Sequence, residues 1–422
     1  MTPAPSPQLL RAAEAVLRGN DRGGYTLPSA DLYPFQWNWD SAFIALGWAA
    51  CDESRAWREL ETLFAAQWPD GMVPHIVFHG RAGRYFPGPE VWRTEREPPT
   101  SGITQPPVAA SCVRWIFERA RDRTLAEAAV KRLLPKLFAW HRWFHRLRDP
   151  ERLGVVHIVH PWESGMDNSP AFDAPLAAVP VEDLEPYERR DLEHVPPEQR
   201  PTRLEYDRYL ALLRVFRDCG WRAREVVRQS PFLVADVGVN MILHRADRDL
   251  LALARAFGAR EMVAALEEWI ATGRQGMERC LRDPETGFYH PRDARRGLRL
   301  AASTHAAFLA FWAGIGDDLL ARRLERWLAA TRFGLSSVAA DDPAFDPDRY
   351  WRGPVWAITN FMIAQGLEEY GRSDLARRLR ADTRVLIQRS GFREYFHPQD
   401  GRGLGGRAFS WTAAVLLAEQ AG

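Results

Sequence analysis

The amino-acid sequence predicts an all-α fold, a single closed (α/α) barrel built from helix hairpins and carrying long lid loops. Apolar residues recur with the 3.6-residue period of helices along most of the 422 residues. Strand-like alternation is nearly absent outside short pieces such as 155–159. No linker or composition break divides the chain, so we expect one domain over residues 1–422.

Each expected helix is an apolar-periodic stretch closed by a turn that contains Gly, Pro or Asp. Asp40 is well placed as the N-cap of the SAFIALGWAA helix, which is the structural alternative to a role in binding, and Pro354 suits the first turn of a later helix. Consecutive helices of this kind pair as hairpins, and hairpins in tandem close into a barrel. The expected helices cover residues 7–19, 40–50, 54–67, 105–121, 124–148, 205–219, 232–256, 260–282, 301–313, 316–330, 353–370, 373–390 and 409–420.

Two long segments interrupt the helical pattern. Residues 68–104 are rich in Gly, Pro and aromatic side chains, and residues 149–204 contain many charges and prolines. Loops of this length inside a compact domain are usually lids or binding loops. We therefore expect both segments to cover a binding site between the helix ends.

The composition excludes several classes of protein. The chain is 46% hydrophobic, with a formal net charge of +1, which argues against a disordered protein and against a nucleic-acid partner held by phosphate contacts. No apolar run reaches the roughly 18 residues of a membrane span. The four cysteines show no C-x-x-C pair, so we expect reduced thiols and a cytoplasmic location. A homo-oligomer remains open.

Two aromatic-rich stretches carry carboxylates suited to sugar chemistry. The first is the sequence QWNWD at 36–40, where two Trp rings flank an amide beside Asp40. Aromatic faces stack on the C–H faces of a sugar, while amides and carboxylates bond its hydroxyls. The second, HPWESGMDNSP at 160–170, contains Trp162 and Asp167. A carboxyl held against Trp faces loses solvation and stays protonated near neutral pH, as a general acid requires.

Two further stretches lie in the C-terminal part of the chain. The sequence YWRGPVW at 350–356 precedes a helix and resembles one wall of a pocket. Glu394 stands among aromatic residues before a glycine-rich turn, which has neither the preceding strand nor the spacing of a nucleotide loop. With Glu394 as base and Asp167 as acid, the chain would contain the carboxyl pair of glycoside hydrolysis.

These motifs resemble glycoside hydrolase family 63, whose members are α-glucosidase-like inverting enzymes with an (α/α)6 barrel. The resemblance rests on WNWDSAF at 37–43, PWESGMDNSP at 161–170, YWRGPVW at 350–356 and EYFHPQDGRGLGGRAFSWT at 394–412. It spans nearly the whole chain. Larger members carry an extra N-terminal β domain, for which there is no room here. The compact chain resembles the bacterial branch that hydrolyses glucosylglycerate and mannosylglycerate.

The resemblance implies a role for each matching residue. Asp167 would be the general acid and Glu394 the general base. Trp39 and Asp40 would contact the sugar, with Trp356 as a further ring contact. The remaining substrate-binding residues that it implies are Tyr85, Gln105, Trp162, Gly165, Tyr350 and Trp351.

The anionic end of the substrate calls for a cation. Arg supplies a planar donor fork that matches a carboxylate. In RPTRLEYDRYL, Arg203 and Tyr209 resemble the pair that meets the glycerate carboxylate, with Arg208 as a rival on the same stretch. The expected partner is therefore a small anionic glycosyl-glycerate. The sequence does not separate its glucosyl from its mannosyl form.

Three other interpretations compete with this one. Terpene cyclases also build α-barrels lined with Trp, and QWPDG at 67–71 superficially echoes their repeats, but only one copy is present. A non-catalytic sugar-binding barrel would keep the Trp walls without needing both carboxylates. His141 and His145 have a zinc-like spacing without the Glu of H-E-x-x-H. The resemblance implies no cofactor and no metal.

Overall fold

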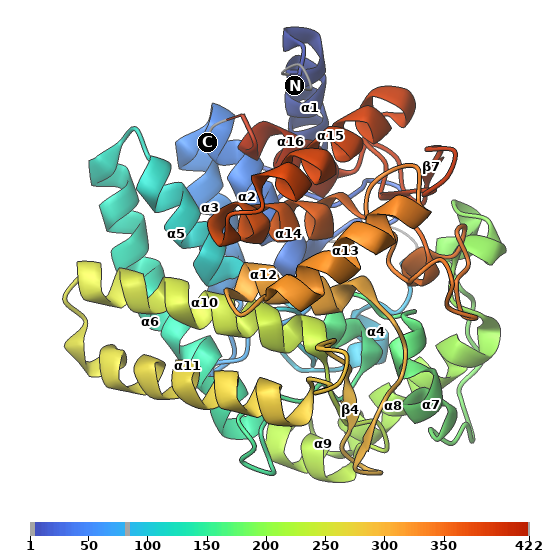
Figure 1. The fold of residues 1–422 in the computed structure, drawn as a ribbon. Helices are drawn as coiled ribbons and strands as arrows, with labels where there is room; N and C mark the ends of the chain where they lie inside the picture. The colour runs from blue at the N-terminus through green and yellow to red at the C-terminus, as the bar shows by residue number, and fades with distance from the viewer. Residues whose placement is uncertain (1–4, 81–84, 421–422) are drawn as a thin grey trace.

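The computed structural model describes residues 5–80 and 85–420, whose main helices form an inner and an outer ring (Figure 1). The inner ring consists of α2 (Asn38–Cys51), α5 (Ala109–Arg119), α10 (Val237–Ala256), α12 (Leu309–Ala313), α14 (Ala357–Tyr370) and α16 (Ser410–Ala418). The outer ring consists of α1 (Pro7–Asn20), α3 (Glu53–Ala65), α6 (Arg123–Leu147), α11 (Arg260–Cys280), α13 (Asp318–Ala330) and α15 (Ser373–Ser390).

Apolar patterning assigns each helix to its ring. All of α16 is buried, and so is α2 from Asn38 to Trp48. A helix that is apolar all round has neighbours on every side. The outer helices are amphipathic instead. In α13 the side chains of Leu320, Leu324 and Trp327 face inward, and the Trp327 ring packs at right angles to that of Phe308, 5.2 Å away.

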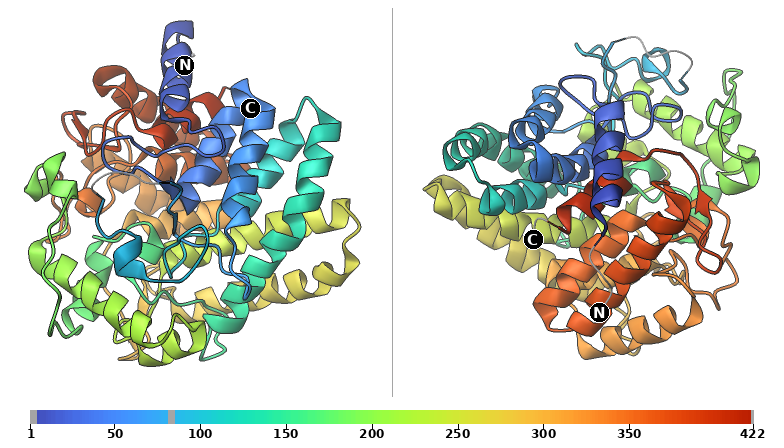
Figure 2. Two further views of the ribbon diagram at one scale, coloured as in Figure 1. Left: turned by 180° about the vertical axis from the view of Figure 1, so that it is seen from behind. Right: turned by 90° about the horizontal axis from the view of Figure 1, so that it is seen from above.

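Helix contacts close the inner ring. Helix α2 packs between α5 and α16, and contacts continue from α5 through α10, α12 and α14 back to α16. The first helix, α1, packs on the last, α16, and the view from above shows the two beside each other (Figure 2). The predicted all-α barrel is thus confirmed, and most helix bounds lie within a few residues of the expected ones.

The segments between the barrel helices contain further helices, of which α8 is the longest. These are α4 (Pro89–Trp92), α7 (Asp173–Ala177), α8 (Arg203–Asp218), α9 (Ala223–Gln229), and the 3-10 helices η1 (Pro161–Ser164), η2 (Pro170–Phe172), η3 (Asp191–Glu193), η4 (Pro197–Gln199), η5 (His305–Phe308) and η6 (Tyr350–Arg352). The expected lid 68–104 contains α4, and its residues 81–84 lie outside the described part. The expected lid 149–204 contains η1 to η4 and α7.

Very short antiparallel strands tie the loops together. They are β1 (Gln36–Trp37), β2 (Ile76–Val77), β3 (Val234–Ala235), β4 (Arg292–Asp293), β5 (Leu298–Arg299), β6 (Tyr395–Phe396) and β7 (Gly403–Leu404). Strand β1 pairs with β2, β4 lies between β3 and β5, and β6 pairs with β7. In the β1–β2 pair Gln36 lies opposite Val77, and in the β6–β7 pair Tyr395 lies opposite Leu404.

Asp40 is not the N-cap of its helix, so the structural alternative for this residue does not hold. Helix α2 begins two residues earlier, at Asn38, and its N-cap residue Trp37 makes no side-chain capping bond. The backbone N–H of Asn38 donates instead to the His75 carbonyl, 3.0 Å away. Asp40 therefore lies inside the first turn of α2, where its carboxyl is not needed for capping.

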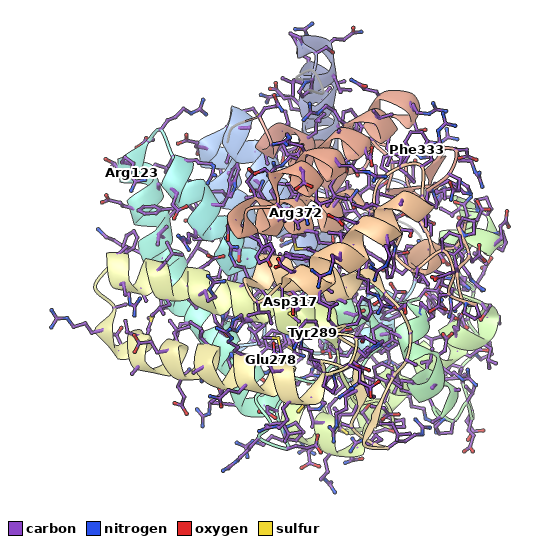
Figure 3. All side chains as sticks on the ribbon, viewed as in Figure 1. Arg123, Glu278, Tyr289, Asp317, Phe333 and Arg372 are labelled. Carbon is purple, nitrogen blue, oxygen red and sulfur yellow. The ribbon has the colours of Figure 1, made fainter. Side chains whose placement is uncertain are left out.

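Charged side chains cover the outside of the barrel. Figure 3 labels Arg372 and Asp317, which directly precede the outer helices α15 and α13, and Glu278 of α11, whose carboxylate accepts a hydrogen bond of 2.8 Å from Tyr289. No described helix is both long and apolar enough to cross a membrane.

The histidine pair on α6 has a structural partner. His141 Nδ1 and His145 Nε2 lie 2.7 and 2.9 Å from the two oxygens of the buried Asp247 carboxylate on α10. These contacts join an outer helix to an inner one. In the described part of the chain, no three His, Cys, Asp or Glu side chains are grouped as metal ligands would be.

Two helical glycines test how tightly the inner ring is packed. A Cβ on Gly366 of α14 would lie 2.2 Å from backbone atoms of Phe311 and Trp312 in α12, whereas a Cβ on Gly19 of α1 meets nothing within 4 Å. We expect Gly366→Ala to lower the free energy of unfolding by about 2 kcal/mol through overpacking. The matched Gly19→Ala variant should be as stable as the parent or more so. Melting temperatures measured side by side check both. Equal melting temperatures for the two variants would contradict the close approach of α12 and α14.

Candidate active site

A cavity of about 120 Å³ lies where the loops that precede several inner helices converge. Its wall is rich in aromatic rings and contains three buried carboxyls. Nine of the thirteen residues predicted to form the site line it, namely Trp39, Asp40, Tyr85, Gln105, Trp162, Gly165, Asp167, Tyr350 and Glu394. Six separate segments of the chain thus contribute to one cavity, which explains why the sequence motifs lie so far apart.

Asp167 follows the turn that closes η1. Gly165 forms this turn at φ +68°, and a Cβ there would lie 2.6 Å from the Trp39 ring, so only glycine allows this approach. The Tyr209 hydroxyl donates a 2.8 Å hydrogen bond to the Asp167 backbone carbonyl and fixes the turn from behind. Burial raises the pKa of Asp167 to about 7, against the opposing effect of Arg200. Its carboxyl is therefore protonated over much of the neutral range.

Glu394 immediately precedes β6 and is held at both oxygens. The Tyr33 hydroxyl donates to Oε1 over 2.8 Å, and the Gly406 N–H donates to Oε2 over 2.9 Å. Arg200 Nη1 lies 3.7 Å from Oε1. Burial raises the pKa of Glu394, while Arg200 and the two donors oppose the rise. These donors favour the ionised form, which a general base needs.

Asp40 adds a third buried carboxyl from the first turn of α2. Burial, followed by repulsion from Glu394, raises its pKa well above the ordinary range. The neighbouring Trp39 backbone N–H donates to Gln105 Oε1 over 3.1 Å, which fixes the Gln105 amide at the cavity wall. A carboxyl and an amide beside the Trp39 ring match the hydroxyls and the C–H face of a sugar.

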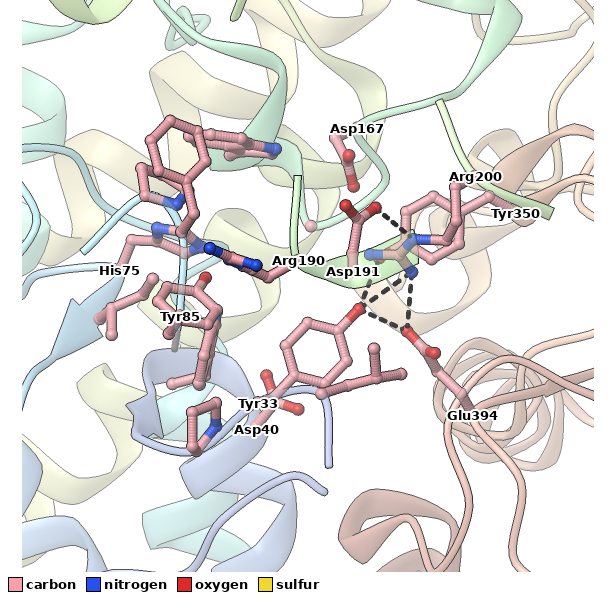
Figure 4. Close-up of a pocket in the computed structure, with 18 of the residues that line it drawn as sticks. Tyr33, Asp40, His75, Tyr85, Asp167, Arg190, Asp191, Arg200, Tyr350 and Glu394 are labelled. Carbon is pink, nitrogen blue, oxygen red and sulfur yellow. Dashed lines mark hydrogen bonds and ion pairs between the residues drawn. The ribbon is translucent and has the colours of Figure 1, made fainter. Parts of the chain in front are cut away.

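Arg200 is a buried cation in the middle of this site (Figure 4). Its Nη1 donates to the Tyr33 hydroxyl over 3.1 Å, its Nε donates to Asp191 over 3.1 Å, and its guanidinium lies 4.4 Å from the centre of the Tyr350 ring. Figure 4 shows Asp167 and Glu394 on different sides of this cation. Three facing carboxyls with one guanidinium among them define an anion-accepting acid–base site.

Arg203, predicted to meet the carboxylate of the ligand, lies outside the cavity. Helix α8 begins at Arg203, after the capping box of Thr202 and Glu205. The Arg203 side chain is 59% exposed and bonds Asp207 on the same helix. Tyr209 is buried behind the cavity wall rather than in it. The rival Arg208 donates to the Ala177 carbonyl and does not line the cavity either.

The cavity holds the same residue types three positions earlier. Arg200 and Tyr206 both line it, and they have the six-residue spacing of Arg203 and Tyr209. The structure thus places an Arg–Tyr pair of the predicted spacing at the cavity, three residues before the predicted pair. The capping box of α8 is the signal that separates them, because it places Arg200 in the loop before the helix.

Trp351 and Trp356 also lie behind the wall. Their rings stack 3.6 Å apart at an interplanar angle of 3°, and Trp356 packs 5.3 Å from Tyr350, which does line the cavity. They support the lining residue instead of forming the surface. Further lining residues lie in loops without a distinctive motif and were not predicted, namely Tyr33, His75, Arg190, Asp191 and His194; Trp37 of the QWNWD stretch also lines the cavity.

The fold and the site together define a class of enzyme. An (α/α)6 barrel with an aromatic cavity, one protonated carboxyl and one carboxylate held by donors is the arrangement of a glycoside hydrolase. A family model described as "Mannosylglycerate hydrolase MGH1-like glycoside hydrolase domain" matches residues 33–412. The chain belongs to this family, within glycoside hydrolase family 63. This assignment excludes the terpene-cyclase and non-catalytic alternatives.

Similar proteins support the assignment over the full length. A mannosylglycerate hydrolase of Thermus thermophilus is 53% identical over 97% of this chain and 99% of its own length. A glucosylglycerate hydrolase of Mycolicibacterium hassiacum is 37% identical over 97% of each chain. The crystal structure of a GH63 mannosylglycerate hydrolase from Thermus thermophilus in complex with Tris and D-glycerate superposes with a TM-score of 0.94, covering 98% of this chain and all of that one.

The raised pKa of Asp167 leads us to expect a pH-dependent rate of hydrolysis. An acid must be protonated to act, so kcat/KM for glycoside hydrolysis should fall as the pH rises through about 7. Asp167→Asn should lower kcat by roughly 10²–10⁴-fold and abolish this alkaline limb. Asp236→Asn is the matched control, because Asp236 is a buried carboxyl that does not line the cavity. A pH–rate profile of the three proteins decides, and an unchanged limb in Asp167→Asn would rule out the assignment.

Proposed function

We propose that this protein is an inverting α-glycoside hydrolase that releases glucose or mannose from a 2-O-α-glycosyl glycerate. The proposal treats residues 1–422 as a single catalytic domain. It is supported by relatives named mannosylglycerate hydrolase and glucosylglycerate hydrolase. The single observation that carries it is the buried guanidinium of Arg200 between the two carboxyls Asp167 and Glu394.

Asp167 and Glu394 divide the acid–base work. Asp167, protonated because burial raises its pKa, donates its proton to the glycosidic oxygen as the bond to the anomeric carbon breaks. Glu394 takes a proton from a water molecule that attacks the same carbon from the opposite face. Attack from that face inverts the configuration, and the two carboxyls then need room for the water between them.

Arg200 accounts for the anionic part of the substrate. A glycerate carboxylate needs a cation with several parallel donors, which a guanidinium offers. The protein uses Arg200 Nε for Asp191 and one donor of Nη1 for Tyr33, and a guanidinium has five N–H donors in all. Tyr206 lines the same part of the cavity, and its hydroxyl lies 3.3 Å from the Phe86 carbonyl. We assign the carboxylate to Arg200 and Tyr206.

The sugar ring is assigned to other residues that line the same cavity. Trp39 and Trp162 offer faces for its C–H groups, and Asp40 and Gln105 offer oxygen and amide groups for its hydroxyls. Because all four cysteines of the chain are free, the protein suits a reducing compartment, and we propose that it acts in the cytoplasm.

The reaction is tested with a panel of α-linked 2-O-glucosyl and 2-O-mannosyl glycerates, glycolates and lactates. We expect the glycerates to release free sugar, with the β anomer appearing first in NMR spectra recorded during the reaction. First appearance of the α anomer would refute inversion. Release from none of the panel members would refute the substrate class.

The position of the cation is tested by two arginine variants. Arg200→Ala should raise KM for a glycosyl glycerate by about tenfold or more, because a charge-assisted hydrogen bond to a buried anion is lost. Arg203→Ala should change KM less than about twofold, because its side chain is exposed and pairs within α8. Steady-state kinetics of both variants decide. The reverse order of effects would restore the assignment to Arg203.

A further inference from the structure

A carboxylate lines the cavity in the very place where an anion is expected to bind. Asp191 of η3 belongs to the cavity wall together with Arg200. A carboxylate repels a bound carboxylate unless cations neutralise it. Asp191 is neutralised on both sides: Arg189 donates to its two oxygens over 3.1 and 2.6 Å, and Arg200 Nε donates to Oδ2 over 3.1 Å.

Arg189 is itself anchored to the helix that follows. Its guanidinium lies 4.5 Å from the centre of the Tyr206 ring, and its Nη1 donates to the Pro201 carbonyl. Arg189 and Arg200 are both almost fully buried. Asp191 is thus fixed from the protein side and offers Arg200 a rigid acceptor. Burial raises the pKa of Asp191, but the two arginines outweigh it and the pKa is lowered overall, so the group is ionised at working pH.

Other groups contact the Arg200 guanidinium on the side of Glu394. Tyr33, from the loop before β1, accepts a hydrogen bond from Nη1 of Arg200. Oε1 of Glu394, just before β6, lies 3.7 Å from the same nitrogen. Tyr350 of η6 packs under the guanidinium, Tyr395 of β6 lies beside Glu394, and Asp167 feels the charge of Arg200 from across the cavity. Among these described neighbours, Asp191 and Glu394 are the charged groups that compete directly for the cation.

We propose that Asp191 is a positioning residue that holds Arg200 toward the aglycone carboxylate and away from Glu394. This inference rests on the proposed hydrolysis of glycosyl glycerates. With Asp191 in place, the guanidinium shares its charge and keeps terminal donors for the substrate. Without the Asp191 carboxylate, the adjacent buried acceptor for Arg200 is Glu394. A closer Arg200–Glu394 ion pair lowers the pKa of Glu394 and makes it a weaker base. It also moves the guanidinium away from the substrate carboxylate.

The first test measures binding without turnover. Asp191→Asn keeps the shape of the side chain and removes its charge. We expect the dissociation constant of D-glycerate, measured by calorimetry, to rise by about tenfold or more. Glu198→Gln is the matched control, because Glu198 is an exposed acid two residues from Arg200 that does not line the cavity. Its affinity should equal that of the parent. Unchanged affinity in Asp191→Asn would overturn the proposal.

The second test separates positioning from a merely structural role. The parent enzyme should prefer a glycosyl glycerate over the neutral glycosyl glycerol, and Asp191→Asn should lose most of this preference in kcat/KM. Both limbs of its pH profile should move to lower pH by about half a unit or more, because the undivided charge of Arg200 lowers the pKa of Glu394 and of Asp167. An equal loss on both substrates with unmoved limbs would show a structural role only.

A third variant keeps the proposal testable if Asp191→Asn does not fold. Asp191→Glu retains the charge but moves the carboxylate by one methylene, so its pH limbs should stay in place while D-glycerate binds more weakly. Limbs that move, or affinity that does not change, would overturn the proposal. A parent enzyme that hydrolyses neither substrate would instead refute the proposed function itself.

Discussion

Burying three carboxyls around one cavity is the constraint on which the site depends. Asp40, Asp167 and Glu394 are all nearly inaccessible to solvent, and buried carboxylates so close together cannot all be ionised. The structure resolves this with one buried guanidinium and an unequal supply of donors. Glu394 receives a tyrosine hydroxyl, a backbone N–H and the field of Arg200. At Asp167 and Asp40 burial is the largest effect and raises the pKa of each. At Glu394 the donors and Arg200 oppose the same effect of burial. The difference in protonation comes from the surroundings, since the chemical groups are alike.

The barrel makes such surroundings possible by bringing distant loops to one end. Trp39 and Asp40 begin an inner helix, Asp167 follows η1, Tyr350 lies in η6 and Glu394 precedes β6. The Trp351–Trp356 stack behind Tyr350 and the Tyr209 bond behind Asp167 brace the wall from outside the cavity. Packed residues behind the cavity wall therefore hold Tyr350 and Asp167 in place.

The sequence predicted the helices well because their apolar periodicity is long and regular, as in α6 and α11. It also predicted that Asp167 and Glu394 belong to one site together with several aromatic residues, and these side chains line one cavity, since Trp and carboxylates in turn-rich stretches have few structural uses. It failed at Arg203, where two Arg–Tyr pairs of equal spacing stand in one stretch and only the start of α8 separates them. Tyr33, His75 and Asp191 could not be found, because single residues in irregular loops acquire their role only from partners distant in the sequence.

The Tyr33–Glu394 hydrogen bond joins residues 361 positions apart, and the ring that supports it closes through α2 and α16. During synthesis on the ribosome, α2 emerges long before α16. The hydrophobic faces of the early hairpins therefore stay exposed until α16 is synthesised. During this time they can aggregate or bind chaperones. Catalytic competence arrives in the same event as barrel closure. A nascent or C-terminally truncated chain thus contains Asp167 but does not yet hold Glu394 in the cavity, and hydrolytic activity should report directly on completed folding.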